Sequence, residues 1–132
     1  LSRGPDEPED QAIGAFYDRL LKLLKRPVFR NGSWRRIDPR PVDDDNRTYD
    51  GFIAFAWSGL DGERILGVVN YAHAAGQCRL PLAFMELRRK TVRLVDLMSE
   101  VRYERSGDEL SAAGLYVDMP PWAYHLFELT PS

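Results

Sequence analysis

The chain has 132 residues, 44% of them hydrophobic and 29% charged, with a formal net charge of −2 and a pI of about 5.7. These values fit one globular domain and exclude a disordered chain, and they give no overall field that would attract nucleic acid or an anionic membrane. No apolar run approaches the ~18 residues of a membrane-spanning helix, so we expect neither a nucleic-acid nor a membrane partner.

The first part of the chain contains one predicted helix. Residues 1–10 carry two prolines and four acidic residues, and we expect a flexible N-terminal tail there. Over residues 11–26 apolar side chains recur at the spacing of an amphipathic helix, with basic residues at its end and Pro27 after it. Its main stripe comprises Ile13, Phe16, Leu20 and Leu24. This stripe is expected to pack on a sheet face of the same domain, on a second domain or on a second copy of the chain.

The remainder of the chain, residues 27–132, has the pattern of a β-domain. After a turn at 28–32 and a loop at 38–50, alternation predicts short strands at 33–37, 52–57, 64–71, 78–82, 91–97, 101–105 and 109–112. Two more alternating runs flank Pro120–Pro121 within 115–129, which predicts a closing hairpin. Seven or eight short strands with turns between them are typical of a mostly β, Greek-key-like antiparallel β-sandwich, here preceded by one α-helix.

Two of these strands carry predictions about their faces. Trp57 shares a strand face with Ile53 and Phe55, and we expect this face to lie in the core. The strand at 64–71 is apolar on both faces, so it is predicted to be central and covered on both sides. Gly67 inside it suggests a bulge or a close approach of another backbone.

The residues that carry chemistry do not form a recognisable active site. His73 and His125 have no metal-ligand spacing, and Asp96 and Asp118 lie at strand positions where we expect them to cap turns. Cys78 is alone, which excludes an internal disulfide or a cysteine metal cluster and permits a reducing cytosol. We therefore predict no catalytic residue, no metal and no cofactor in this chain.

Two tryptophans are candidates for contact with sugar. Trp34 and Trp122 have flat faces of the kind that stack on sugar rings in carbohydrate-binding β-sandwiches. The alternative is that they are packing residues of the core or of an interface, where aromatic side chains contribute much of the binding energy. Trp122 follows the double proline, which favours an exposed ring there.

Several stretches, taken in order, resemble one enzyme family. FYDRLLKLLKRPVFRNGSW (16–34) resembles the segment that closes the catalytic barrel of α-amylase superfamily enzymes. FAW…GERILGVVNY (55–71) is similar to a strand of that family's C-terminal domain that ends in a characteristic asparagine, here Asn70. VRLVDLMSEVRYE (92–104) and LYVDMPPWAYHLFEL (115–129) resemble its hairpin and its closing strands. The order and spacing of these motifs carry the resemblance over nearly the whole chain.

The resemblance implies that residues 11–26 are the last barrel helix, and 27–132 the C-terminal domain, of an α-amylase-like hydrolase or transglycosidase acting on α-glucosidic bonds. The family's catalytic residues belong to the barrel, so this chain alone is expected to be non-catalytic. Its expected partners are the barrel of the same enzyme and α-glucan, contacted through Trp122 or Trp34. The alternatives are a free-standing carbohydrate-binding module and an oligomerisation domain that dimerises through the helix stripe.

Overall fold

The computed structural model describes residues 14–15, 18–19, 21–60, 62–82 and 87–132. The expected tail at 1–10 and three residues of the stripe, Ile13, Phe16 and Leu20, lie outside this part of the chain. Before Pro27, residues 14–15, 18–19 and 21–24 are helical, as the periodicity predicts. We call these residues the leading segment.

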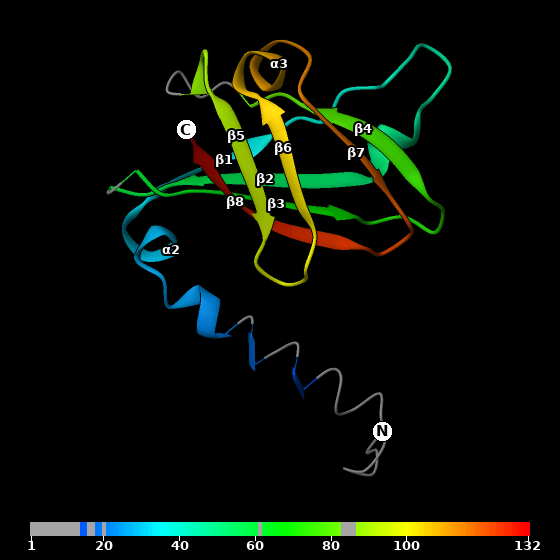
Figure 1. Cartoon of the computed structure of the whole chain (residues 1–132). Coiled ribbons are helices and arrows are strands. Elements are labelled where there is room, and N and C mark those ends of the chain that lie inside the picture. The colour runs from blue at the N-terminus through cyan, green and yellow to red at the C-terminus, as the bar shows by residue number, and fades with distance from the viewer. Residues whose placement is uncertain (1–13, 16–17, 20, 61, 83–86) are drawn as a thin grey trace, which may run out of the picture.

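The described part of the chain forms eight strands in two antiparallel sheets that pack face to face (Figure 1). The strands are β1 (Ser33–Ile37), β2 (Phe52–Ser58), β3 (Arg64–Asn70), β4 (Gly76–Leu80), β5 (Thr91–Asp96), β6 (Arg102–Ser106), β7 (Leu115–Met119) and β8 (Tyr124–Pro131). The larger sheet has the order β1-β2-β3-β8-β5-β6, and the smaller one pairs β4 with β7. This arrangement confirms the predicted mostly β, antiparallel sandwich and the central place of β3. The outer face of β3 is not fully covered, since Gly67 and Val69 are only partly buried there.

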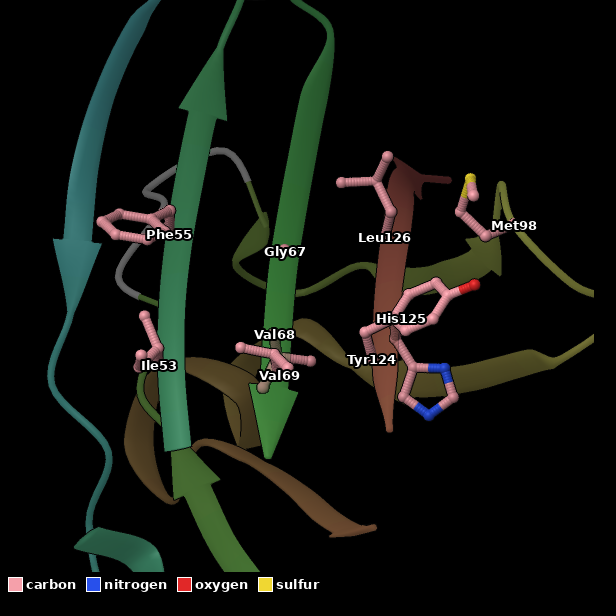
Figure 2. Close-up of a pocket in the computed structure, with 9 residues that line it drawn as sticks. All are labelled: Ile53, Phe55, Gly67, Val68, Val69, Met98, Tyr124, His125 and Leu126. Carbon is pink, nitrogen blue, oxygen red and sulfur yellow. The ribbon is translucent and has the colours of Figure 1, made fainter. Parts of the chain in front are cut away.

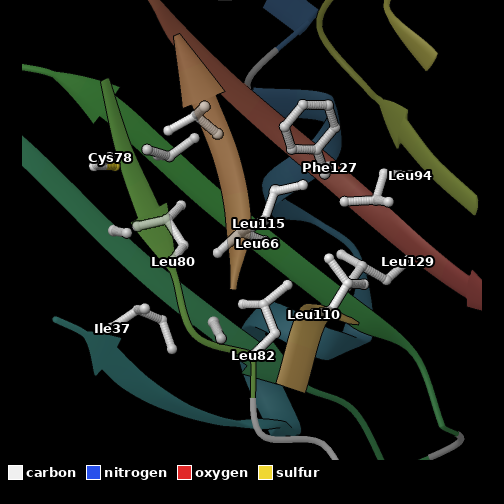
Figure 3. Close-up of a cluster of buried hydrophobic side chains, with 14 of the residues drawn as sticks. Ile37, Leu66, Cys78, Leu80, Leu82, Leu94, Leu110, Leu115, Phe127 and Leu129 are labelled. Carbon is white, nitrogen blue, oxygen red and sulfur yellow. The ribbon is translucent and has the colours of Figure 1, made fainter. Parts of the chain in front are cut away.

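The core lies between the two sheets because period-two alternation directs one side of each strand inward. The buried residues of β7 are Leu115, Val117 and Met119. From the opposite sheet, Phe127 and Leu129 of β8 meet them, and Leu110 closes one end of the core (Figure 3). Each of these side chains contributes about 1.5–3 kcal/mol when it is fully buried.

The predicted closing hairpin is wrong. Strand β7 pairs with β4, whereas β8 pairs with β3 and β5, so Pro120–Pro121 joins the two sheets and not two neighbouring strands. Proline suits this position because the connection leaves both ladders and needs no N–H donor. Alternation is the same for strands in a hairpin and for strands in opposite sheets, so the pattern did not separate the two.

Two short helices stand where the sequence pattern predicts other structure. Residues 109–112, a strand by their pattern, belong to α3 (Gly107–Ala112). Ser106 caps it, since its Oγ accepts a hydrogen bond from the N–H of Glu109 at 3.4 Å, and Ser-x-x-Glu is a helix-start signal in the sequence. The expected turn at 28–32 is mostly α2 (Pro27–Asn31), which begins at the proline that ends the leading segment. A 3-10 turn, η1 (Thr48–Gly51), precedes β2.

The face of β2 that carries Trp57, a core face by its pattern, instead points away from β4 and β7. The residues that face the core are Phe52, Ala54 and Ala56, each no more than 5% exposed, whereas Ile53 on the other side is 40% exposed. Alternation defines two faces without saying which is internal. Here the small alanines let the second sheet approach closely, and the larger side chains form an outer surface.

Candidate functional site

A shallow apolar groove crosses the outer face of the larger sheet, over β2, β3 and β8. Its volume is about 200 Å³. The residues that line it are Ile53, Phe55, Gly67, Val68, Val69, Met98, Tyr124, His125 and Leu126 (Figure 2). We call it the outer groove. The imidazole of His125 points away from it, so its surface is made by aliphatic and aromatic side chains.

Gly67 forms the floor of the outer groove between Phe55 and Leu126 (Figure 2). It pairs with these two residues in unbroken register, so the bulge that the sequence suggests does not occur. A Cβ placed on Gly67 would lie 3.2 Å from Cζ3 of Trp57 and 3.5 Å from a methyl carbon of Leu126. The close approach at this glycine is therefore made by the indole ring of Trp57.

The leading segment and α2 join the sandwich at this outer face. The ring of Phe29 in α2 packs edge-on against Trp57, with centroids 5.1 Å apart. The guanidinium of Arg26 lies 3.1 Å from the carboxylate of Glu63 and 3.2 Å from that of Glu128 on β8. These contacts fix the point at which the chain enters the sandwich, and they put that point beside the outer groove.

The leading segment continues below the larger sheet, on the side away from β4 and β7 (Figure 1). Burial raises the pKa of the Tyr124 phenol and the charge of Asp96 adds to this rise, while the charge of Arg19 in the leading segment opposes it.

Leu21 and Leu24 of the leading segment are 58% and 44% exposed. The sandwich therefore does not cover Leu24, the one residue of the predicted stripe that the structure describes.

Trp34 belongs to the same outer surface. It lies opposite Trp57 in the β1–β2 ladder, is 62% exposed and packs edge-on against Phe55 at 5.4 Å. Trp122 does not join it, because Trp122 bonds to Asn70 at the far end of β3, about 17 Å along the strands at 3.3 Å per residue. The structure thus places the two candidate sugar-contacting tryptophans in different surfaces.

Trp122 forms an exposed aromatic cluster with two residues of the β3–β4 connection. The ring of Tyr71 lies 4.9 Å from it and that of His73 5.2 Å from it, both nearly perpendicular to the indole. Trp122 is 48% exposed and has φ +61°, in the left-handed region where bulky residues are rare. Such strain costs about 1–3 kcal/mol and is concentrated at functional sites.

Asn70 holds Trp122 in this conformation. Its carbonyl accepts the N–H of Trp122 at 2.8 Å, and its N–H donates to the carbonyl of Ala123. Its buried side-chain amide donates to the carbonyls of Ala74, Met119 and Pro120 at 3.0–3.2 Å. One asparagine thus ties the end of β3 to the connection between the two sheets. The sequence flags this position only through the resemblance to the α-amylase superfamily.

A buried carboxylate lies on the inner side of the larger sheet. Asp96 is 2% exposed and accepts hydrogen bonds from the N–H groups of Met98 and Leu126, from Ser99 and from His125. Burial alone would raise the pKa of this carboxyl, but these hydrogen bonds outweigh it and hold the pKa below its ordinary value. The prediction that Asp96 caps a turn is confirmed, whereas Asp118 instead accepts from Gln77 across the β4–β7 ladder.

The described residues contain no group of three or more His, Cys, Asp or Glu side chains gathered as metal ligands. None of the helices in that part of the chain has both the length and the apolar character to span a membrane. Cys78 is buried in the core, and burial raises the pKa of its thiol to about 12.

Comparison with known proteins places the fold. No family model matches the chain, and no curated protein matches it. Among solved structures, a candidate α-N-acetylgalactosaminidase from Bacillus halodurans is similar, with a TM-score of 0.50 and 15% identity. The match covers 74% of this chain and 22% of that protein, so the chain corresponds to about a fifth of its length. The chain is thus a β-sandwich of a type that also occurs inside a larger candidate glycosidase; at this identity the likeness concerns the fold alone.

Proposed function

We propose that this chain is the last barrel helix (11–26) and the C-terminal accessory domain (27–132) of an α-amylase-like enzyme acting on α-glucosidic bonds. In this proposal the domain stabilises the catalytic barrel and supplies no catalytic residue. The motif resemblance supports the family, and the fold shared with part of a larger candidate glycosidase supports the role as one domain among several.

The observation that carries the proposal is the outer groove beside the point of chain entry. A face lined by Ile53, Phe55 and Leu126 is costly to leave in water, since each such side chain is only partly buried and would gain part of the about 1.5–3 kcal/mol of full burial. Arg26 and Phe29 anchor the preceding helix at this same face. A barrel whose last helix is the leading segment would therefore lie beside the groove.

The test uses the protein encoded by the whole reading frame. The double variant Ile53→Ser/Leu126→Ser removes two groove side chains, and Leu60→Ser is the matched control, because Leu60 is 88% exposed and lies outside the groove. We expect the groove variant to lower the Tm of the full protein by about 4 °C or more and to speed proteolysis near residue 26, and the control to change neither. In the isolated 132-residue chain the groove variant should lower Tm by less than in the full protein, because Ile53 and Leu126 are already partly buried there, and Leu60→Ser should leave Tm nearly unchanged.

Three outcomes would overturn the proposal: a reading frame without a barrel upstream, a groove variant that behaves like Leu60→Ser, or cleavage of α-glucan by the isolated chain. A light-scattering mass of two chains that returns to one chain in Leu24→Ser would favour the oligomerisation domain instead. That residue is exposed in the single chain and belongs to the predicted stripe.

A second candidate, contact with α-glucan, is favoured by the strained and exposed Trp122. Tyr71 and His73 flank its ring, which gives a surface of three aromatic groups. Starch-affinity electrophoresis tests this, with Trp122→Ala as the variant and Trp34→Ala, at the far end of the strands, as the control. Retardation that is lost in Trp122→Ala alone supports the contact, and an isolated wild-type chain that starch does not retard contradicts it.

A further inference from the structure

A second pocket lies on the opposite, inner side of the larger sheet, at the open edge of the sandwich. Its volume is also about 200 Å³, and β6, β7 and β8 line it. Its lining includes Tyr103 and Arg105 of β6, Tyr116 and Asp118 of β7, and His125 and Phe127 of β8. We call it the edge pocket. It exists because a two-stranded sheet is too narrow to cover the inner face of six strands.

Polar residues occupy positions in the edge pocket where alternation calls for apolar ones. Tyr103 pairs with Leu94 and Arg105 with Val92, and both partners are buried in the core, so β6 turns its Tyr and Arg inward. Tyr103 packs against the ring of Phe127 with centroids 5.8 Å apart, yet polar groups at inward positions depart from the folding pattern, and such local departures are expected at a functional site.

The imidazole of His125 has a fixed orientation in this pocket. Its Nδ1 lies 2.8 Å from Oδ2 of Asp96, and its ring stacks on Phe127 with centroids 4.9 Å apart and planes 25° apart. Because the carboxylate of Asp96 can only accept, Nδ1 donates in this hydrogen bond, and Nε2 is the second hydrogen-bonding atom of the ring. A buried carboxylate thus prepares one hydrogen-bonding atom of the pocket before any ligand binds.

The rim of the edge pocket holds donors and acceptors in balance. The guanidinium of Arg105 can only donate, and it lies over the ring of Tyr103 at 5.0 Å. The carboxylate of Asp118 can only accept, and Gln77 fixes one of its oxygens at 2.9 Å. With one charge of each sign, the rim prefers neither an anion nor a cation. Adjacent hydroxyl groups of one ligand can accept from the guanidinium and donate to the carboxylate.

We propose that the edge pocket binds a single ring of a neutral sugar. The aromatic side chains of Tyr103 and His125 accommodate the C–H face of a pyranose, with the fully buried Phe127 supporting the His125 ring from behind, and the rim satisfies the hydroxyl groups of the sugar. The volume admits one ring and not a chain. The inference does not depend on the proposed function, because the outer groove lies on the other face of the sheet and the Trp122 cluster is a separate surface.

Nuclear magnetic resonance of the isotope-labelled chain, titrated with methyl α-glucopyranoside and with methyl α-galactopyranoside, tests the proposal. We expect saturable shifts of the His125 ring and of Tyr103 and Tyr116 with a Kd in the millimolar range. Tyr103→Ala should weaken binding roughly tenfold, Tyr103→Phe should largely keep it, and Leu60→Ser, which is 88% exposed and outside the pocket, should leave it unchanged. Because Tyr103 lies on an edge strand and is 37% exposed, both variants should fold.

Three results of the titration would overturn the sugar-binding proposal. The absence of saturable shifts with either glycoside up to about 100 mM overturns the proposal, and so do shifts confined to Trp122 and Tyr71. Inorganic phosphate that shifts the same edge-pocket resonances at lower concentration than the glycosides overturns the neutral-sugar assignment. Failure of this test leaves the barrel-docking proposal intact, since that is measured by the Tm of the outer-groove variant.

Discussion

The carboxylate of Asp96 on β5 and the imidazole of His125 on β8 meet at 2.8 Å on the inner side of the larger sheet, although the residues are 29 positions apart. The same carboxylate accepts the N–H of Leu126 on the neighbouring strand. One ionised group therefore fixes a turn, links two strands and orients a ring at the edge pocket.

We expect Asp96→Asn to lower the stability at neutral pH by about 2 kcal/mol, since it removes hydrogen bonds to a charged acceptor. The pKa of this carboxyl is lower in the folded chain than its unfolded value of about 3.9, so its contribution is present above about pH 4 and is lost as the pH falls through the folded pKa. Urea denaturation between pH 3 and 7 measures this. A wild-type-to-variant difference that is constant over the range contradicts the assignment.

Asn70 offers a test of the connection between the sheets. Its amide donates to three carbonyls, so Asn70→Ala should cost about 2–3 kcal/mol. Asn70→Asp should cost more, because it sets a carboxylate against the same carbonyl oxygens in a site that is 0% exposed. Thermal unfolding of both variants gives the order, and an Asp variant as stable as the Ala variant would show that the amide donors contribute little.

The sequence pattern predicted the strands because alternation is local. The bounds of β1 are those predicted, and β2, β3, β5 and β6 differ from them by a few residues or fewer. Alternation could not predict the pairing of β7 with β4 or the outward face of Trp57, since both depend on which elements approach from elsewhere in the chain. The helix α3 was within reach through Ser106 and Glu109, a capping pattern that alternation hides.

The candidate sites likewise contain residues that the sequence indicates and contacts that only the structure shows. Trp34 and Trp122 were candidates in the sequence because of their flat rings and, for Trp122, the preceding double proline, and both are exposed in the structure. The pairing of Asp96 with His125 and the inward position of Arg105 leave no local trace. They arise from strand order, which places β5 between β8 and β6.

Gly107 is required at its position by contact with the backbone. A Cβ there would lie 1.6 Å from the carbonyl oxygen of Leu87, so Gly107→Ala must shift the chain and should cost about 3 kcal/mol. Gly62 is the control: it has φ +90° but no neighbour within 4 Å, so Gly62→Ala should cost about 1 kcal/mol. Chemical denaturation measures both, and equal losses would mean that the contact with Leu87 is relieved without cost.

Cys78 should report on global unfolding. Its side chain is 0% exposed and burial raises the pKa of its thiol from 9.0 to about 12, which lowers the thiolate fraction about a thousandfold at neutral pH. We expect a thiol reagent to label the native chain slowly, at a rate that increases with urea in parallel with unfolding. Fast labelling of the native chain would contradict burial of this residue in the core.

Substitutions at Trp122 separate backbone strain from the role of the ring. Trp122→Gly and Trp122→Ala both remove the contacts with Tyr71 and His73, but only glycine adopts φ +61° without cost. The Gly variant should therefore be more stable than the Ala variant by about 1 kcal/mol, and Trp122→Val should be the least stable of the three. Thermal unfolding gives this order. If the Gly variant matches the wild type in stability yet loses retardation on starch, the strained backbone serves to present the indole ring and not to hold the fold; a Gly variant less stable than the Ala variant would show that the backbone at this position is not strained.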